Sequence, residues 1–326
     1  MIDLYNKNSN FSAIPEDLAQ NFSVAILLCA YNGARFLATQ LESIESQNHV
    51  NWFVVASDDE SCDQTLEILH EYQSRWPEGK LVIRRGPKKG FCQNFLSLAC
   101  DTEIKADYYA FCDQDDVWMP AKLTVALRNI LKNQGPNEAY LYCGRTTYVD
   151  EKLRKVGTSP LFAFPKTFRN ALVQSVAGGN TMVFNHKTKE YLEKAGLVNH
   201  LSHDWWLYQL VTGAGGVVLY DTEPQVLYRQ HKDSLVGGNN SIFASLGRIY
   251  HIFKGQFREW GDINIAALTS INPFLSHDSK DALELFKRLR NASFGERMRL
   301  LKLAGFYRQT RRGTLSLVLA ALIKKI

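Results

Sequence analysis

The sequence predicts an α/β protein whose core is a mainly parallel sheet flanked by helices, followed by a C-terminal helical extension. Short apolar runs alternate four times with stretches of helical periodicity in the first 135 residues. Such alternation, with short connections, is typical of parallel strands joined by helices that cover both faces of a sheet. The run at 24–30 has no polar interruption, which indicates a strand buried on both faces.

The elements of this sheet are expected in a regular order. Apolar runs predict strands over 24–30, 52–57, 81–84 and 108–112. Apolar residues at helical spacing predict helices that include 37–44, 63–72, 95–98 and 120–134. After residue 140 the alternation loosens, and the remaining expected elements are strands at 181–184 and 216–220 with an aromatic helix at 203–211 between them.

The chain is expected to have three parts. Residues 1–21 are polar and predict a loose leader, residues 22–236 the α/β domain, and residues 237–326 a basic helical region. Residues 240–326 hold 15 Lys and Arg against 6 Asp and Glu, whereas the net charge of the whole chain is +5. The total charge gives no reason to expect a nucleic-acid partner, but the local excess indicates an anionic surface.

The composition and the ends of the chain predict a cytoplasmic protein. The first residues do not resemble a signal peptide, and the six cysteines contain no C-x-x-C pair, which indicates reduced thiols. No stretch has the roughly 18 apolar residues that span a bilayer. The apolar run at 315–323 lies between basic residues and predicts a helix on the membrane surface. The alternative is an ordinary last helix packed on the domain.

The sequence Asp-Gln-Asp-Asp at 113–116, called the DQDD segment below, follows the fourth expected strand. Ligands of open parallel sheets bind beyond the carboxyl ends of the strands. Residues two apart in an extended chain point the same way, so Asp113 and Asp115 can converge on Mn²⁺ or Mg²⁺, with substrate phosphates as further ligands. The alternative is a solvated loop in which Asp116 caps the helix that begins near Pro120.

A second acidic pair, Asp58 and Asp59, ends the second expected strand. A carboxylate at this position can accept hydrogen bonds from a pyrimidine N–H group or a ribose hydroxyl group. The alternative is a structural role in which Ser61 or Asp63 caps the helix that follows.

Four segments in register resemble glycosyltransferases of family 2, which have a GT-A (Rossmann-like) fold. The segments are Ala-Tyr-Asn-Gly at 30–33, Ser-Asp-Asp at 57–59, Gly-Phe with Asn-Phe at 90–95, and Asp-Gln-Asp-Asp-Val-Trp at 113–118. The last is similar to the rhamnosyltransferase-like branch of surface polysaccharide synthesis. The resemblance covers about 22–235, and it implies a nucleotide-diphosphate sugar donor, a divalent metal and inversion at the anomeric carbon.

The resemblance also implies roles for individual residues. Residues expected to bind the nucleotide sugar are Ala30, Tyr31, Asn32, Asp58, Asp59, Gly90, Asn94, Asp113 and Gln114. Residues expected to bind the metal are Asp115, Asp113 and His231. One position departs from the family, because Glu60 stands where the family usually has a glycine, and a glycine that allows close backbone approach or a positive φ is thereby lost.

The segment at 203–206 supplies the expected catalytic base, Asp204, which would deprotonate the acceptor hydroxyl group. In the family this acid commonly follows Glu, and here it follows a histidine. The residues expected on the acceptor side are His203, Trp205, Trp206 and Gly179. The alternative is that Asp204 merely stabilises a helix N-terminus and that the tryptophans belong to the core.

Together these features predict an inverting, metal-dependent glycosyltransferase. It would move a sugar, with rhamnose suggested by the branch, to a growing surface polysaccharide or a lipid-linked saccharide at the cytoplasmic face of the membrane. One alternative is a sugar nucleotidyltransferase, although 29–33 is not the Gly-rich phosphate loop which that chemistry needs. The other is a catalytically silent carbohydrate-binding protein at a membrane surface. The sequence leaves the nucleotide base, the linkage and the oligomeric state open.

Overall fold

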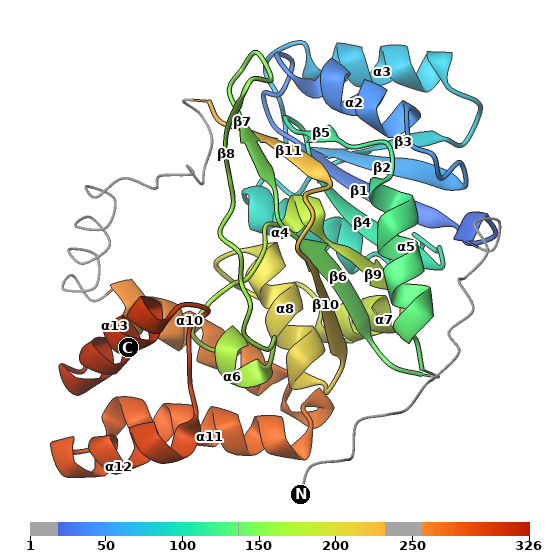
Figure 1. The fold of residues 1–326 in the computed structure, drawn as a ribbon. Coiled ribbons are helices and arrows are strands. Elements are labelled where there is room, and N and C mark those ends of the chain that lie inside the picture. The colour runs from blue at the N-terminus through green and yellow to red at the C-terminus, as the bar shows by residue number, and fades with distance from the viewer. Residues whose placement is uncertain (1–18, 136, 232–255) are drawn as a thin grey trace, which may run out of the picture.

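The computed structural model describes residues 19–135, 137–231 and 256–326 (Figure 1). Its centre is a seven-stranded sheet in the order β10-β6-β9-β4-β1-β2-β3. Its strands are β1 (Val24–Ala30), β2 (Trp52–Asp58), β3 (Leu81–Arg85), β4 (Tyr108–Asp113), β6 (Tyr140–Gly144), β9 (Val183–Asn185) and β10 (Val217–Asp221). Within this sheet β9 pairs antiparallel with both of its neighbours, and the other pairs are parallel. The prediction of a mainly parallel α/β sheet is confirmed.

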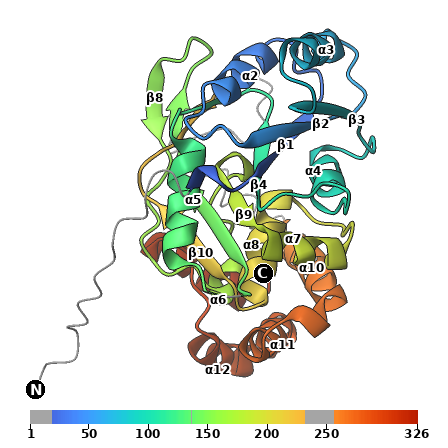
Figure 2. The same cartoon turned by 90° about the vertical axis from the view of Figure 1, so that its right-hand side faces the viewer.

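Helices cover both faces of this sheet, because its strands are apolar on both sides. Along β1, Val24, Ile26 and Leu28 belong to one apolar cluster, and Ala25 and Leu27 belong to the other. The first cluster is covered by α2 (Leu37–Glu45), α3 (Thr65–Arg75) and α5 (Lys122–Asn133). The second is covered by α4 (Phe91–Ala99), α6 (Phe168–Ala171), α7 (His186–Ala195) and α8 (His203–Gly213). Figure 2 shows α5 on one side of the sheet and α4 and α7 on the other.

A second, four-stranded sheet has the order β5-β11-β7-β8 and was not predicted. Its strands are β5 (Val117–Trp118), β7 (Thr147–Val149), β8 (Lys155–Thr158) and β11 (Val226–Arg229). Strands of two to four residues are too short to carry a periodic signature. This sheet pairs β11 with β5, directly after the DQDD segment, and so brings residues 226–231 to the edge where the expected ligands lie.

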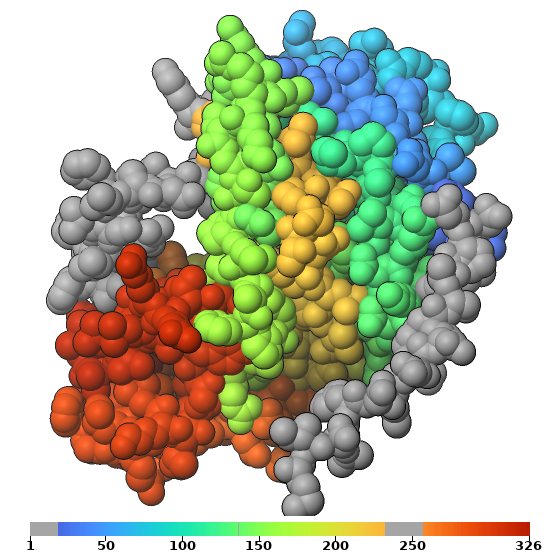
Figure 3. Space-filling model, in the orientation of Figure 1, coloured from blue at the N-terminus to red at the C-terminus, as the bar shows by residue number. Residues whose placement is uncertain are grey.

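The C-terminal region is helical, as predicted, and consists of α10 (Gln256–Ser270), α11 (His277–Asn291), α12 (Phe294–Ala304) and α13 (Arg311–Leu322). Its apolar side chains, among them Phe286, Leu289 and Leu317, belong to the same cluster that covers one face of the sheet. Gln309 bonds to the 164–174 segment, donating its main-chain N–H to Gln174 and accepting from the main-chain N–H of Phe164. Figure 3 shows these helices, in orange to red, against the green segment that contains β8.

Two expected boundaries need correction. The end of the leader is not loose, because Ala19 is buried and the side-chain amide of Gln20 bonds to the main chain at Asn48 and Val50. The strand expected at 181–184 begins later, because 179–181 forms a 3-10 turn, η1 (Gly179–Thr181). A second 3-10 turn, η2 (Asn272–Phe274), joins α10 to α11. The domain boundary expected near 236–240 and residues 1–18 of the leader lie outside the described residues.

Two further expectations concern membranes and thiols. Within residues 19–135, 137–231 and 256–326, no helix is both long enough and apolar enough to cross a bilayer. All six cysteines are free thiols, and four of them are buried, as predicted.

Candidate active site

Strand register brings the predicted polar residues to one edge of the central sheet. β1 lies between β2 and β4, with Ala30 opposite Asp58 and Cys29 opposite Asp113. The loops that follow these three strands therefore start next to one another at the same edge of the sheet. The N-terminus of α8, with Asp204, lies close enough for its charge to act on Asp113.

The structure brings together two of the predicted metal ligands. His231 Nε2 lies 2.8 Å from Asp115 Oδ2, although the two residues are far apart in the sequence. Asp113 is partly buried beside them, and burial, together with the negative charges of Asp115 and Asp204, raises the pKa of its carboxyl group well above the usual range. A bound cation would relieve this repulsion.

The residues present fit a divalent cation that shares its ligands with a substrate. In the described part of the chain no group of three or more His, Cys, Asp or Glu side chains has the arrangement of a complete metal cage. Mg²⁺, however, is usually held by one or two carboxylates together with water and substrate phosphates, and carboxylate oxygens also suit Mn²⁺. Asp115 has a 21% exposed side chain, so its carboxylate is accessible to such a complex.

The last residue of the DQDD segment, Asp116, has a structural role instead of the helix-capping role considered above. It is fully buried and accepts hydrogen bonds from Asn180 Nδ2 at 2.5 Å and from the main-chain N–H of Arg229 at 3.2 Å. Arg229 Nε donates to the main-chain oxygen of Asp115 at 2.9 Å. These bonds fix the DQDD segment against η1 and β11. Asn180 was missed because 64 residues separate it from Asp116.

Gln114 was expected to contact the donor, but both ends of its side-chain amide bond to the main chain of Tyr31. The Tyr31 N–H donates to Gln114 Oε1 at 2.8 Å, and Gln114 Nε2 donates to the Tyr31 oxygen at 3.0 Å. The Tyr31 side chain itself is 57% exposed and accessible to a nucleotide base. Gln114 therefore positions the loop that carries Tyr31.

The hydrogen bonds between the Gln114 side chain and the main chain of Tyr31 leave no room for a side chain at Gly33. A Cβ atom at Gly33 would lie 2.1 Å from Gln114 Oε1. We expect Gly33→Ala to break the pairing with Tyr31, to lower stability by about 1–3 kcal/mol, and to weaken donor binding. Thermal unfolding and donor titration would measure both effects. Gly295→Ala is the control, because no atom lies within 4 Å of that position. Unchanged donor affinity in Gly33→Ala would contradict a role for the Tyr31 loop in binding.

The remaining residues expected to bind the nucleotide mostly brace the loops around it. Asp58 accepts hydrogen bonds from Ser61 Oγ at 2.5 Å and from the Ser61 N–H at 3.0 Å, so Ser61 braces the end of β2 and does not cap α3. Asp59 accepts from the main-chain N–H groups of Lys88 and Gly90. Asn94 accepts a hydrogen bond from Ser57 Oγ and donates one to the main-chain oxygen of Ser57. Asn32 accepts one from the main-chain N–H of Cys62.

The departure at residue 60 leaves the backbone shape of the loop intact. Glu60 adopts φ = 72°, a conformation that favours glycine. Its carboxylate forms ion pairs with Lys88 and Arg85 on the neighbouring loop. Glu60 therefore itself adopts the positive φ that a glycine at this position would readily take.

The predicted catalytic base lies in the first turn of α8. Asp204 Oδ1 accepts hydrogen bonds from Ser202 Oγ at 2.5 Å and from the Trp205 N–H at 2.6 Å. Burial raises the pKa of the Asp204 carboxyl group, although these hydrogen bonds oppose the shift. A carboxylate with a raised pKa is a better proton acceptor near neutral pH. Ser202, which orients this carboxylate, was not predicted.

The residues next to Asp204 pack mainly against the protein core, and not toward a site where a substrate could bind. Trp206 is fully buried, so it cannot form the wall for the acceptor that was considered for it. The His203 ring stacks on Phe95 at 3.8 Å, and burial lowers the pKa of His203 to about 3, so the ring is neutral. Trp205 Nε1 donates to the Ala171 oxygen at 2.7 Å. A Cβ atom at Gly179 would lie 2.2 Å from His203 Nε2, so this glycine permits the close packing of η1 on α8.

One site residue that sequence reasoning missed is Lys122, at the start of α5. Its side chain is fully buried, and its Nζ atom lies 3.4 Å from the centroid of the Trp118 ring. Nζ has no hydrogen-bond acceptor among the described residues. Its charge acts on Asp113 and Asp116, whereas burial lowers the pKa of the amine to about 7. Lys122 thus supplies a positive charge beneath the DQDD segment.

We expect Lys122→Met to make the protein more stable but to weaken metal-dependent donor binding about tenfold at pH 6. Methionine keeps the volume and removes a costly buried amine, which should raise the melting temperature. Loss of the positive charge raises the pKa of the Asp113 carboxyl group further, so protons compete better with the cation. The difference should shrink toward pH 8, where Lys122 is itself neutral.

Donor titrations with Mn²⁺ at pH 6, 7 and 8 would test this expectation. Lys132→Met is the matched control, because Lys132 is exposed in the last turn of the same helix. Equal affinities of the Lys122→Met variant and the native protein at pH 6 would refute the electrostatic role of Lys122.

Comparison with known proteins agrees with this arrangement. Residues 25–192 match the family model described as Glycosyl transferase family 2. The chain is 29% identical over 245 residues to the dTDP-rhamnosyl transferase RfbG of Shigella flexneri, covering 71% of this chain and 81% of that protein. It is 28% identical over 126 residues to the UDP-Glc:alpha-D-GlcNAc-diphosphoundecaprenol beta-1,3-glucosyltransferase WfgD of Escherichia coli, covering 37% of this chain and 45% of that protein.

A solved structure has a similar fold. The S. aureus TarS 1–349 structure in complex with UDP-GlcNAc superposes with a TM-score of 0.56 at 14% identity. The superposition covers 80% of this chain and 70% of that chain. At this level of identity the likeness concerns the fold alone.

Proposed function

Because the chain belongs to glycosyl transferase family 2 and has the GT-A fold, we propose that it transfers a sugar from a nucleotide-diphosphate sugar to an acceptor hydroxyl group with inversion at the anomeric carbon. The observation that carries this proposal is the convergence of acidic groups from distant segments. Asp113 ends β4 and Asp115 follows it, and the charge of Asp204, at the start of α8, acts on Asp113.

In the proposed reaction, Asp204 accepts the proton of the acceptor hydroxyl group. The hydroxyl oxygen forms a bond to the anomeric carbon while the bond from that carbon to the diphosphate breaks, and the leaving diphosphate retains the bonding electrons. Ser202 and the Trp205 N–H hold Oδ1 of the base. The proton of the acceptor would be taken by the other oxygen, Oδ2.

Asp115 and His231, with Asp113 beside them, would hold Mn²⁺ or Mg²⁺. When bound, the cation neutralises the charge that develops on the departing diphosphate. The 2.8 Å approach of His231 Nε2 to Asp115 Oδ2 and the crowding of negative charge at Asp113 support this assignment. The exposed Tyr31 ring is the proposed platform for the nucleotide base.

For the finer specificity we propose a dTDP-rhamnose donor and a saccharide acceptor of surface polysaccharide synthesis, carried on a lipid at the cytoplasmic face of the membrane. The name of RfbG, which matches most of this chain, supports the donor. The name of WfgD, a shorter match, refers to a diphosphoundecaprenol acceptor and supports the lipid. Neither a nucleotidyltransferase nor a silent carbohydrate-binding protein has a specific observation in its favour.

A thermal-shift panel tests the donor and the metal together. The full chain would be heated with dTDP-rhamnose, UDP-glucose, UDP-GlcNAc or GDP-mannose, each with Mn²⁺, with Mg²⁺ or with EDTA. A ligand that binds the native state raises the melting temperature, by an amount that grows with its concentration over Kd. We expect the largest rise with dTDP-rhamnose and a divalent cation. No shift with any nucleotide sugar would refute the proposed function, and a larger shift with another sugar would refute the proposed donor.

A further inference from the structure

One side of α13 is apolar and faces outward. Leu315, Leu319 and Ile323 are 61%, 55% and 48% exposed, and they recur every four residues, which places them on one side of the helix. Leu317, Ala320 and Ala321 are buried against the rest of the protein. Exposed apolar groups at regular spacing are uncommon on monomeric proteins and indicate an interaction surface.

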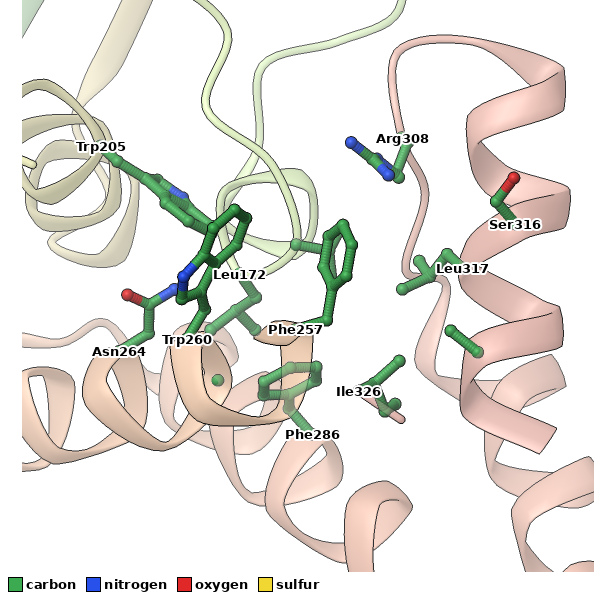
Figure 4. Close-up of a pocket in the computed structure, with 13 residues that line it drawn as sticks. Leu172, Trp205, Phe257, Trp260, Asn264, Phe286, Arg308, Ser316, Leu317 and Ile326 are labelled. Atoms are coloured by element: carbon green, nitrogen blue, oxygen red, sulfur yellow. The ribbon is translucent and has the colours of Figure 1, made fainter. Parts of the chain in front are cut away.

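The helix is held firmly, so this exposure does not reflect a loosely attached segment. Leu317 and Ile326 point into an apolar hollow that they share with Phe257, Trp260 and Phe286 (Figure 4). Two buried arginines fix the end of the helix. Arg290 Nε donates to the Ile326 oxygen at 2.9 Å, and Arg297 donates to the Leu322 oxygen at 3.0 Å.

The charge around this apolar side has a single sign. Residues 297–326 contain eight Lys and Arg and no Asp or Glu. On α13 and just beyond it, Arg311, Arg312 and Lys324 are exposed at the two ends of the apolar stripe. The adjoining helix α12 adds the exposed apolar residues Phe294, Met298 and Leu303 and the exposed basic residues Arg299 and Lys302.

We propose that this α13 face, defined by Leu315, Leu319 and Ile323 with Arg311, Arg312 and Lys324, docks on the surface of an anionic lipid bilayer. An amphipathic helix with cations beside its apolar stripe lies in the interface, with the apolar side chains among the acyl chains and the cations at the headgroups. A nucleic acid would use the cations but leave the leucines in water. The five exposed cations of this stretch, Arg299, Lys302, Arg311, Arg312 and Lys324, have no acid among them in sequence and favour a uniformly anionic surface.

This inference goes beyond the proposed transfer reaction and does not depend on it. It fixes a side of the molecule to the membrane, whereas the reaction concerns the loops that follow β1, β2 and β4. Side chains of α13 and of α8, the helix that carries Asp204, belong to the same apolar cluster.

Vesicle flotation of the full chain tests the proposal. Vesicles of phosphatidylcholine would be compared with vesicles in which part of the phosphatidylcholine is replaced by phosphatidylglycerol. The apolar variant is Leu315→Ser, Leu319→Ser, Ile323→Ser, and the charge variant is Arg311→Gln, Arg312→Gln, Lys324→Gln. Val50→Ser, Leu66→Ser, Val82→Ser is the matched control, because these residues are also exposed and apolar but lie near α3 and β3. Melting temperatures would verify that every variant folds.

We expect the native chain and the control to float with the anionic vesicles. The charge variant should bind about 100-fold more weakly, since each cation near an anionic leaflet contributes a factor of about five. The apolar variant should bind at least about tenfold more weakly. Native protein that does not float with anionic vesicles, or an apolar variant that floats as well as the native chain, would overturn the proposal. The proposal would also be overturned if the native chain bound an oligonucleotide more tightly than anionic vesicles and the apolar variant bound that oligonucleotide equally well. A donor-induced thermal shift in the same variants would report separately on the proposed function.

Discussion

Replacing Asp204 by asparagine is expected to lower turnover by about 10²-fold or more while donor and metal binding stay nearly unchanged. The amide has the size of the carboxylate and can still accept the hydrogen bonds from Ser202 and the Trp205 N–H, but it cannot take the acceptor's proton. Loss of a general base typically costs about 10²–10⁴-fold in rate. Steady-state transfer rates, together with donor titration, would separate the chemical step from binding.

The competing explanation for Asp204 is stabilisation of the N-terminus of α8, and a matched variant tests it. Glu67 is exposed in the first turn of α3, and Glu67→Gln removes the same kind of helix-end charge from another helix. If both variants lose similar stability and neither loses turnover, Asp204 is a structural residue. The same change at His203, made in both the native and the Asp204→Asn backgrounds, would show whether the neutral imidazole affects the base, because only the native background contains it.

The second large effect is expected for Asp115→Asn, which should abolish measurable transfer and remove the dependence of donor binding on divalent cations. A hard cation needs the charge of the carboxylate, which the amide lacks. His231→Ala should weaken the metal response less, because the carboxylate persists. Donor titrations over a range of Mn²⁺ concentrations would measure both variants.

The fold of Asp115→Asn has to be checked, because this residue also contacts His231. Asp116→Asn serves as the contrast. It keeps the ligand set but disturbs the buried bond to Asn180, so we expect a lower melting temperature with a preserved metal response. An Asp115→Asn variant that folds and responds to Mn²⁺ as the native chain does would refute the metal assignment.

The parts of the fold that the sequence predicted are those with a strong local signature. Uninterrupted apolar runs located β1, β2 and β4 within a residue or two, and the family resemblance, confirmed by the match over residues 25–192, supplied the expected order of the site loops. The four-stranded second sheet had no such signature, because its strands are two to four residues long. The position of His231 beside Asp115 depends on that sheet, so only the resemblance suggested it.

Within the site, residue identity was easier to predict than residue role. Gln114, Asn94 and Asp116 were recognised in their motifs, but their partners lie 37 to 83 residues away in the sequence. A polar side chain in a motif can hold a loop as well as a ligand, and composition does not distinguish the two. Lys122 shows the converse case, since a lysine at the start of a helix gives no sign that tertiary packing will bury it.

The shared apolar cluster has a consequence for how the chain unfolds. Phe286, Leu289 and Leu317 from the C-terminal helices belong to the same cluster as Trp206 and Leu210 from α8. If either region opened, apolar side chains of the other would be exposed to water. The two regions are therefore expected to melt together in one cooperative transition.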